Sequence, residues 1–270
     1  MELETYQVHA FASAPYSGNP AGVCLHGPSL DVDEMRAIAM DLGPSVTAFV
    51  EDAAGKRLPL RWFTREGNEV QSFCGHATFA AAHVMLRCRR QALDAIEFET
   101  ISGVRRVEAA GDELTMQIPC WPAHKAPCPD EVSQAFGAEP SEFLLTGRDA
   151  LLVFPDEAAV AALQPDFDLL RPLGSMGWIA CAQTGPASIG FRFFCPGFDI
   201  GEDEDPATGS AFSTLAPHWR QQMAAPVLTA RQMSARGAEF EFGLAGDAAF
   251  VTGTCATFLT GVITQPGGME

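Results

Sequence analysis

The sequence predicts an α+β protein of two similar lobes, each of which wraps a β-sheet around a central helix. Three observations predict this fold. Two segments about half the chain apart share one pattern, each contains a helical run that is poor in charge, and strand-like runs flank both. A helix that is hydrophobic on nearly every face is a buried one, so each sheet is expected to fold around its helix.

The first copy of the pattern begins with an aromatic-rich strand at residues 60–64. A polar, acidic connection follows and leads to Gly75 and His76. These residues open a helix that we expect over residues 76–87, apolar on almost every face until its charged end. The order of the parts is strand, polar connection, then glycine and a polar residue at a helix start.

The second copy repeats that order from an aromatic strand at residues 191–195. Its connection is more acidic and leads to Gly209 and Ser210, which open a helix expected over residues 210–219. Pro217 predicts a kink or an end in that helix. Coincidence between two ordinary strand–helix units is the alternative, but the agreement in both order and spacing favours a repeat.

The remaining strand-like runs divide between the two halves. They lie at residues 7–11, 21–25, 48–51, 104–108 and 114–118 in the first half and at residues 151–154, 177–182, 240–244 and 250–257 in the second. Residues 119–129 contain four prolines and are the linker candidate. We therefore expect lobes at residues 1–118 and 119–270, with the last strand a candidate to return to the first lobe.

One outer helix has clear boundaries in the sequence. Asp31 or Asp33 can cap its start, and Gly43 followed by Pro44 ends it. Between them the apolar residues recur with the helical period, at Met35, Ile38, Ala39 and Leu42.

The composition excludes several classes of protein and partner. The formal net charge of −17 repels phosphate backbones and anionic membrane surfaces, so we expect neither nucleic acid nor membrane as a partner. The acidic N-terminus and the absence of an apolar run of roughly 20 residues predict a cytoplasmic protein. The eight cysteines are scattered without metal-type spacing, and no nucleotide, HExxH or GxSxG motif occurs, so we expect no metal and no cofactor.

The two helix starts predict a small-molecule site. A helix N-terminus presents unpaired N–H groups, and a glycine there lets a ligand approach the backbone. Gly75 with His76 and Gly209 with Ser210 supply two such ends, and Asp205 lies just before the second. Facing each other across a lobe boundary, they would hold a small carboxylate or amino acid. A structural histidine and a turn-forming or capping aspartate are the alternatives.

Six signatures between about residues 6 and 261 resemble those of the PhzF-like (phenazine biosynthesis) isomerases. They are, in order, Gly18-Asn19-Pro20-Ala21, Arg61-Trp62-Phe63-Thr64, Cys74-Gly75-His76-Ala77-Thr78, Asp205-Pro206-Ala207-Thr208-Gly209-Ser210-Ala211, Leu215-Ala216-Pro217-His218-Trp219 and Gln232-Met233-Ser234-Ala235-Arg236-Gly237. The resemblance implies a diaminopimelate-epimerase-like fold with two mixed sheets, often a homodimer, and isomerisation by proton movement without a cofactor.

The resemblance also implies roles for individual residues. A glutamate moves the proton in the family, while a histidine, an aspartate and a serine, matched here by His76, Asp205 and Ser210, hold the substrate. At the glutamate's place the chain has Val46, which cannot carry a proton. His76 and Asp205 are therefore the catalytic candidates. The substrate-binding candidates are Gly75, Gly209, Ser210, Asn19 and Val46.

The altered position leaves several alternatives open. Glu51, Asp52 and Glu69 could replace the missing base only if the chain folds inward at these residues. The related epimerases use two cysteines, and here Cys74 has only Pro206 at the second position. The leading hypothesis is a cofactor-independent isomerase of a small carboxylic or amino acid, of the kind found in secondary metabolism. A non-catalytic binding protein is the second hypothesis and a racemase or epimerase the third.

Overall fold

The computed structural model describes residues 2–90, 92–198 and 202–264, which form two compact units. Unit 1 takes the chain as far as Met116 and again from Gly253, and unit 2 comprises Gln117–Phe198 and Glu202–Thr252. Each unit is a mixed sheet with a buried central helix, so the predicted α+β fold is confirmed. No helix within the described residues is long and apolar enough to span a membrane.

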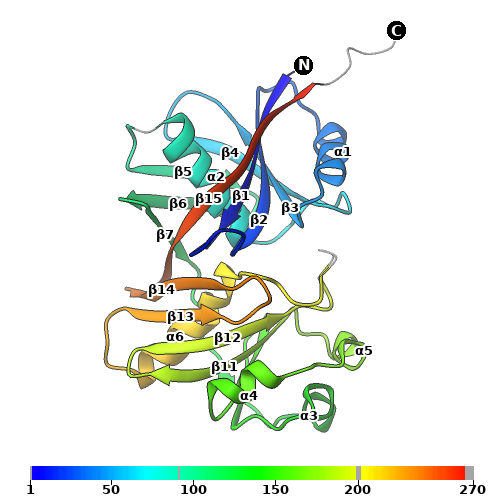
Figure 1. Cartoon of the computed structure of the whole chain (residues 1–270), viewed down its shortest axis with the longest axis vertical. Helices are drawn as coiled ribbons and strands as arrows, with labels where there is room; N and C mark the ends of the chain where they lie inside the picture. Colours follow the sequence, from blue (N-terminus) through cyan, green and yellow to red (C-terminus); the bar gives the residue numbers. More distant parts are fainter. Residues whose placement is uncertain (1, 91, 199–201, 265–270) are drawn as a thin grey trace. The chain divides into compact units, whose positions relative to one another are not determined.

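Unit 1 is built on a mixed sheet (Figure 1). Strands β1 and β2, β3 and β4, β5 and β6, and β6 and β7 pair antiparallel, whereas β2 with β3 and β4 with β5 pair parallel. The strands are β1 (Glu2–Ala10), β2 (Asn19–His26), β3 (Val46–Glu51), β4 (Arg57–Thr64), β5 (Ala95–Thr100), β6 (Gly103–Ala110) and β7 (Glu113–Ile118).

The central helix of unit 1 is α2 (Gly75–His83), which continues as a π-helical segment, η1 (Val84–Arg89). It contacts β1, β2 and β3, and Figure 1 shows it among the strands of this unit. All of its residues from Ala77 to Ala82 are buried, and Phe79 stacks on Phe11 with ring centroids 4.4 Å apart. The helix that the sequence predicted from its all-round hydrophobicity is therefore confirmed.

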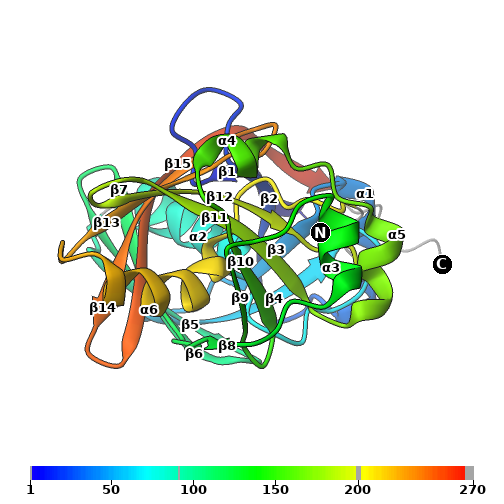
Figure 2. The ribbon, with the colours of Figure 1, turned by 90° about the horizontal axis from the view of Figure 1, so that it is seen from below.

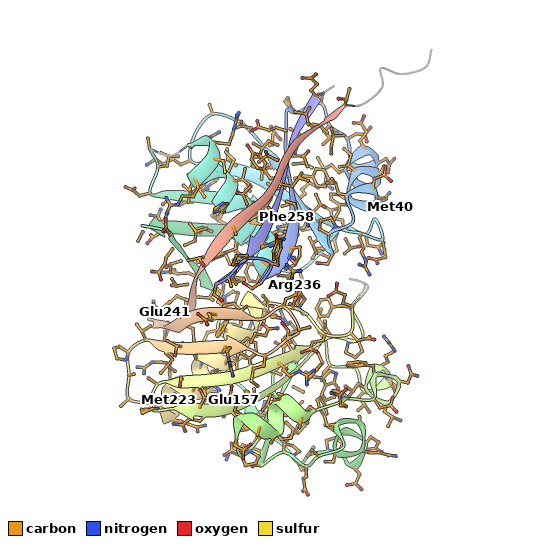
Figure 3. All side chains as sticks on the ribbon, viewed as in Figure 1. Met40, Glu157, Met223, Arg236, Glu241 and Phe258 are labelled. Atoms are coloured by element: carbon orange, nitrogen blue, oxygen red, sulfur yellow. The ribbon has the colours of Figure 1, made fainter. Side chains whose placement is uncertain are left out.

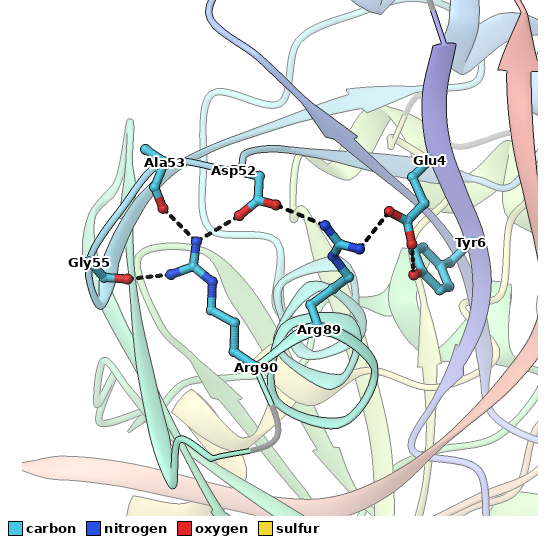
Figure 4. Close-up of polar contacts among 7 residues, drawn as sticks. All are labelled: Glu4, Tyr6, Asp52, Ala53, Gly55, Arg89 and Arg90. Atoms are coloured by element: carbon cyan, nitrogen blue, oxygen red, sulfur yellow. Dashed lines mark hydrogen bonds and ion pairs between the residues drawn. The ribbon is translucent and has the colours of Figure 1, made fainter.

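Two arginines hold the charged end of this helix (Figure 4). Arg89 lies 3.0 Å from Glu4 of β1 and 3.4 Å from Asp52, the residue after β3. Arg90 lies 2.6 Å from the other oxygen of Asp52. Single exposed pairs contribute little, but this chain of linked charges fixes the end of the central helix to two parts of the sheet that surrounds it.

The outer helix α1 (Val32–Leu42) begins and ends where the sequence predicted. Asp31 and Glu34 form a capping box, and Gly43 is in the left-handed conformation at the C-cap. Met35, Ile38 and Ala39 are its buried face. The chain then enters β3 at Val46.

Unit 2 repeats the mixed arrangement of strands. β9 with β10, β11 with β12, and β13 with β14 pair antiparallel, whereas β10 with β11 and β12 with β13 pair parallel. The strands are β8 (His124–Lys125), β9 (Glu142–Leu145), β10 (Asp149–Val153), β11 (Gly177–Gly185), β12 (Ser188–Phe194), β13 (Leu228–Gln232) and β14 (Ala238–Ala245). The short helices α3 (Asp130–Phe136), α4 (Glu157–Ala162) and α5 (Phe167–Leu170) lie outside, with α4 against β11 and β12.

The central helix of unit 2 is α6 (Phe212–Gln222), which a 3₁₀ turn (Gly209–Ala211) precedes. It packs along β14 (Figure 2). Pro217 lies inside it, so of the two expectations, a kink or an end, the helix does not end at this proline. Because proline has no N–H, the carbonyl of Ser213 lacks its helical partner, and it accepts a hydrogen bond of 2.7 Å from the N–H of Trp121 instead.

Strand β15 (Ala248–Thr264) takes part in both units. Its first residues pair with β14, and its later residues, from Cys255 onward, pair with β1. The sequence predicted only residues 250–257 of this strand, because its second half is exposed and lacks an apolar alternation. Phe258, which is labelled in Figure 3, lies in that half and is 54% exposed. Its ring stacks on that of His9, with centroids 5.0 Å apart.

Candidate functional site

In unit 1 the segment after β4 folds back onto the strand. We call residues 68–70 the return segment of this unit. Glu69 forms a bridge with Phe63, and its carboxylate lies 2.7 Å from Nε of Arg61. The hydrogen bond from Arg61 lowers the pKa of Glu69. Glu69, one of the conditional candidates for the missing base, is thus held in an ion pair on β4.

The return segment of unit 2, residues 203–205, repeats this geometry. Glu204 forms a bridge with Phe194, and both of its oxygens lie 2.8 Å from Arg192. In each unit the arginine also lies over the ring of the bridged phenylalanine, at 5.5 Å in unit 1 and 4.7 Å in unit 2. The strand–connection–helix pattern that occurs twice in the sequence therefore corresponds to a repeated structure, and coincidence is ruled out as its explanation.

Asp205 ends the second return segment and is 7% exposed. Its N–H donates to the carbonyl of Phe193 (3.0 Å), and its carboxylate accepts a hydrogen bond from the hydroxyl of Thr208. The side chain of Gln232 donates to the carbonyl of Asp205 (2.6 Å) and accepts from the N–H of Thr208 (2.7 Å). This buried network fixes Asp205 relative to the turn that carries Gly209.

His76 is the second residue of α2 and follows Gly75. Its Nδ1 lies 3.9 Å from Sγ of Cys74, and its Nε2 is buried without a hydrogen-bond partner among the described residues. Burial lowers the pKa of His76 to about 4. The imidazole is therefore neutral near pH 7, with one nitrogen able to donate a proton and the other able to accept one.

Ser210 lies in the 3₁₀ turn that opens the central helix of unit 2. Its hydroxyl oxygen accepts a hydrogen bond of 3.0 Å from Arg148, whose Nε lies 2.8 Å from the buried carboxylate of Asp149. Sequence reasoning missed both residues. An Arg-Asp pair at the start of an ordinary strand carries no motif, and only the tertiary structure brings it to Ser210.

The last two predicted site residues begin neighbouring strands of unit 1. Asn19 opens β2 and is fully buried, and Val46 opens β3 and is 2% exposed. Glu51 is the last residue of β3, roughly 17 Å away along the strand, and Asp52 follows it and pairs with Arg90. Neither acid lies at the end of the strand where Val46 stands, so the inward fold that their candidacy required is absent.

The site residues thus fall into one group for each unit. Unit 1 brings Gly75 and His76 to the start of its central helix, and unit 2 brings Asp205, Gly209 and Ser210 to the start of its own. Within the described parts of the chain, no cluster of three or more histidine, cysteine or acidic side chains suited to a metal occurs.

Comparison with known proteins places these observations in a family. The sequence model of the phenazine biosynthesis-like proteins matches residues 8–241. An uncharacterized isomerase of Pseudomonas aeruginosa is 38% identical over 97% of this chain and 99% of its own length. A crystal structure of a PhzF-family phenazine biosynthesis protein from Enterococcus faecalis has a TM-score of 0.90 and 31% identity, covering 98% of this chain and 100% of that one.

A second structure gives the same result. The X-ray structure of a putative phenazine biosynthesis PhzC/PhzF protein from Clostridium difficile has a TM-score of 0.90 and 32% identity, and the match covers 97% of this chain and 100% of that one. The names of the relatives support an isomerase-type function at the level of the family. With matches of this extent in both sequence and fold, the chain belongs to the phenazine biosynthesis-like (PhzF) family.

Proposed function

We propose that the protein is a cofactor-independent isomerase that moves a proton or a double bond in a small carboxylic or amino acid. The observation that carries this proposal is the repeated strand–return–helix arrangement. One copy ends at a neutral histidine whose Nε2 is buried without a partner among the residues that the structure describes, and the other ends at a buried aspartate near a serine. Membership of a family whose relatives are named isomerases supports the same reading.

In this proposal Asp205 and His76 move the proton. Asp205 is favoured as the base because it is the buried acid just before the helix start of unit 2, 7% exposed and held there by the hydroxyl of Thr208. The neutral imidazole of His76 is suited to pass the proton onward or to donate it. General acid–base help of this kind contributes about 10² to 10⁴ in rate.

The remaining candidates bind the substrate. Gly75 and Gly209 let a carboxylate approach the N–H groups of the two helix starts, and Ser210 donates a hydrogen bond to it. Asn19 and Val46 form part of the wall, with Val46 supplying an apolar surface at the family's glutamate position.

A solvent-exchange screen tests the proposal. The full-length protein is incubated in D₂O with a panel of small amino acids and unsaturated carboxylic acids, and ¹H NMR follows the loss of each C–H signal. We expect exchange into at least one compound, loss of that exchange in Asp205→Asn, and unchanged unfolding midpoints. Exchange that survives in both Asp205→Asn and His76→Ala would overturn the assignment of the site.

A non-catalytic binding protein is the second candidate, and Val46 is the observation that favours it. The position at which the family carries its proton-moving glutamate is an apolar, 2% exposed residue of β3. On this reading the wild type exchanges no compound of the panel but is stabilised against heat by one of them. The exchange and the thermal measurement, made on the same samples, separate the two candidates.

A further inference from the structure

Arg148 in unit 2 is held by three neighbours that no sequence motif predicted. Its Nε lies 2.8 Å from Oδ1 of Asp149, its Nη2 donates to Oγ of Ser210 at 3.0 Å, and its guanidinium lies 4.6 Å from the ring centroid of Trp121. The side chain is only 14% exposed. A planar guanidinium that is stacked on a ring and bonded on two edges has little freedom to move.

The carboxylate side of this contact is equally fixed. Asp149 is fully buried, and its second oxygen accepts a hydrogen bond of 3.3 Å from Thr214 of α6. Burial raises the pKa of Asp149, while the charge of Arg148 opposes that rise. The hydroxyl of Thr146 accepts the N–H groups of both Arg148 (3.1 Å) and Asp149 (2.7 Å), which sets the backbone of the pair.

The aromatic side of the contact depends on the proline in α6. Because Pro217 has no N–H, the carbonyl of Ser213 is available, and it holds the N–H of Trp121. The ring of Trp121 then lies against Arg148. A feature that interrupts the hydrogen bonding of the helix therefore helps to place the guanidinium beside the first turn of the same helix.

The polarity of the contact with Ser210 follows from the chemistry of arginine. A guanidinium has donors and no acceptor, so the oxygen of Ser210 must accept. Within the described residues this is the one hydrogen bond of the Ser210 side chain. Its own proton therefore points away from Arg148 and is available to an acceptor outside the protein.

We propose that Arg148 is a positioning residue that fixes the Ser210 hydroxyl as a hydrogen-bond donor to a carboxylate oxygen of the ligand. This rests on the proposed function, in which Ser210 binds the substrate. Asp149 balances the charge of Arg148, so the arginine contributes orientation rather than net attraction. The ligand class is a small carboxylate, and its neutral amide should bind less well.

The experiment uses the full-length, ¹⁵N-labelled protein with benzoate as the probe and benzamide as its neutral counterpart. The amide signals of Gly209 and Ser210 follow the titration. We expect benzoate to shift both signals, Arg148→Met to weaken its binding about tenfold, and Ser210→Ala to weaken it by a similar factor. In the double variant the loss should be no larger than in Ser210→Ala alone, because the arginine acts through the serine.

Further variants protect the test against misfolding and unspecific charge effects. Arg148→Lys keeps a cation beside Asp149 but lacks the planar fork, and we expect a loss of about threefold. Arg148→Met combined with Asp149→Asn removes both charges and leaves no unpaired buried carboxylate. Arg231→Met is the matched control, because it removes an exposed guanidinium that pairs with Glu157 in the same unit.

Two results would overturn the inference. One is a wild type in which benzoate shifts neither Gly209 nor Ser210. The other is an effect of Arg148→Met that is equally large in the Ser210→Ala background, which would mark a general structural role. The outcome is separable from that of the proposed function. Benzoate binding with the expected coupling but no deuterium exchange would contradict the proposed isomerase and keep the positioning role of Arg148. Deuterium exchange without that coupling would contradict only the positioning role.

Discussion

In unit 1 the N–H of Val70 donates to the carbonyl of Trp62, whereas in unit 2 the N–H of Asp205 donates to the carbonyl of Phe193, the equivalent strand residue. Both follow a glutamate that pairs with an arginine of the strand. The shared ion pair therefore belongs to the scaffold, and the residue after it carries the difference in chemistry. A repeated backbone gives two equivalent positions, and only one of them holds an acid.

A second pair of equivalent positions, within the two sheets, also differs in having an acid in one unit only. Phe63 pairs with Thr47 of β3, and Phe194 pairs with Trp178 of β11. The residues just before these partners, Val46 in unit 1 and Gly177 in unit 2, are therefore equivalent. Their parallel neighbours are Ala21 and Asp149. Unit 2 thus carries a buried carboxylate where unit 1 carries an alanine. The small size of Gly177 leaves room for that carboxylate, because a Cβ there would lie 2.7 Å from Oδ1 of Asp149.

The largest effect on stability is expected from placing a carboxylate at Val46 in unit 1, where the natural sheet has none. The residue equivalent to Arg148 is Pro20, so Val46→Glu would bury an acid without a neighbouring arginine on β2. We expect a loss of roughly 3 kcal/mol in the free energy of unfolding at pH 7, relative to the neutral control Val46→Gln. Urea titrations of both variants measure the difference.

The sign of the pH dependence checks the cause. Burial raises the pKa of the new glutamate in the folded state above its unfolded value of about 4.3. The folded state then keeps a proton that the unfolded state has released. The penalty relative to Val46→Gln should therefore grow as the pH rises above this value and vanish below it. Equal stabilities of Val46→Glu and Val46→Gln at both pH 4 and pH 8 would point to steric overpacking, which the two variants share, rather than to a buried charge.

Local signals explain which parts of the fold the sequence predicted. The helix α1 was predicted with both ends because its cap residues, Asp31 and Gly43, act through neighbouring backbone. The central helices were predicted from their low charge and from the glycine and polar residue that open each of them. Strands β5, β9 and β13 and helices α3 to α5 were missed, because they are short or alternate between buried and exposed residues too briefly to stand out.

The residues of the candidate site also divide into those that local motifs predicted and those that only the tertiary structure reveals. His76, Asp205 and Ser210 could be selected because each lies in a short motif at a helix start or just before it. The partners that fix them could not. Arg148 lies 62 residues from Ser210 in the chain, and Gln232 lies 27 residues from Asp205. Contacts at such separations depend on the register of strands, which a single sequence does not reveal.

A smaller effect should come from filling the space beside Asp149. Gly177→Ala places a Cβ against Asp149 and the ring of Phe193, so we expect a loss of roughly 2 kcal/mol in the free energy of unfolding. Gly147→Ala in the same unit is the control, since a Cβ there meets nothing within 4 Å. Equal stabilities of the two variants in urea would mean that the sheet of unit 2 relaxes around the new methyl group.

The smallest expected effect is a difference in pH dependence between the starts of the two central helices. Unit 1 opens its central helix with a histidine and unit 2 with a serine, so only the first should respond to pH near neutrality. The pKa of His76 is about 4 in the folded state, against about 6.5 when unfolded. The unfolded state binds the proton first as the pH falls, so stability is present above pH 6.5 and is lost between pH 6.5 and 4.

The contribution of His76 to that loss should be roughly 1–2 kcal/mol between pH 7 and pH 5. His76→Gln should remove it, whereas Ser210→Ala should leave the pH dependence of unfolding as it is in the wild type. His83 is the matched control because burial also lowers its pKa to about 4, and it lies in the same helix with its Nε2 2.9 Å from Oγ1 of Thr257. His83→Gln should remove a separate share of the loss, and the two shares should add. If His76→Gln leaves the difference between pH 7 and pH 5 unchanged, the imidazole titrates at its ordinary pKa. It would then be charged for part of the time near neutral pH, which would remove the basis for a neutral proton carrier at the start of α2.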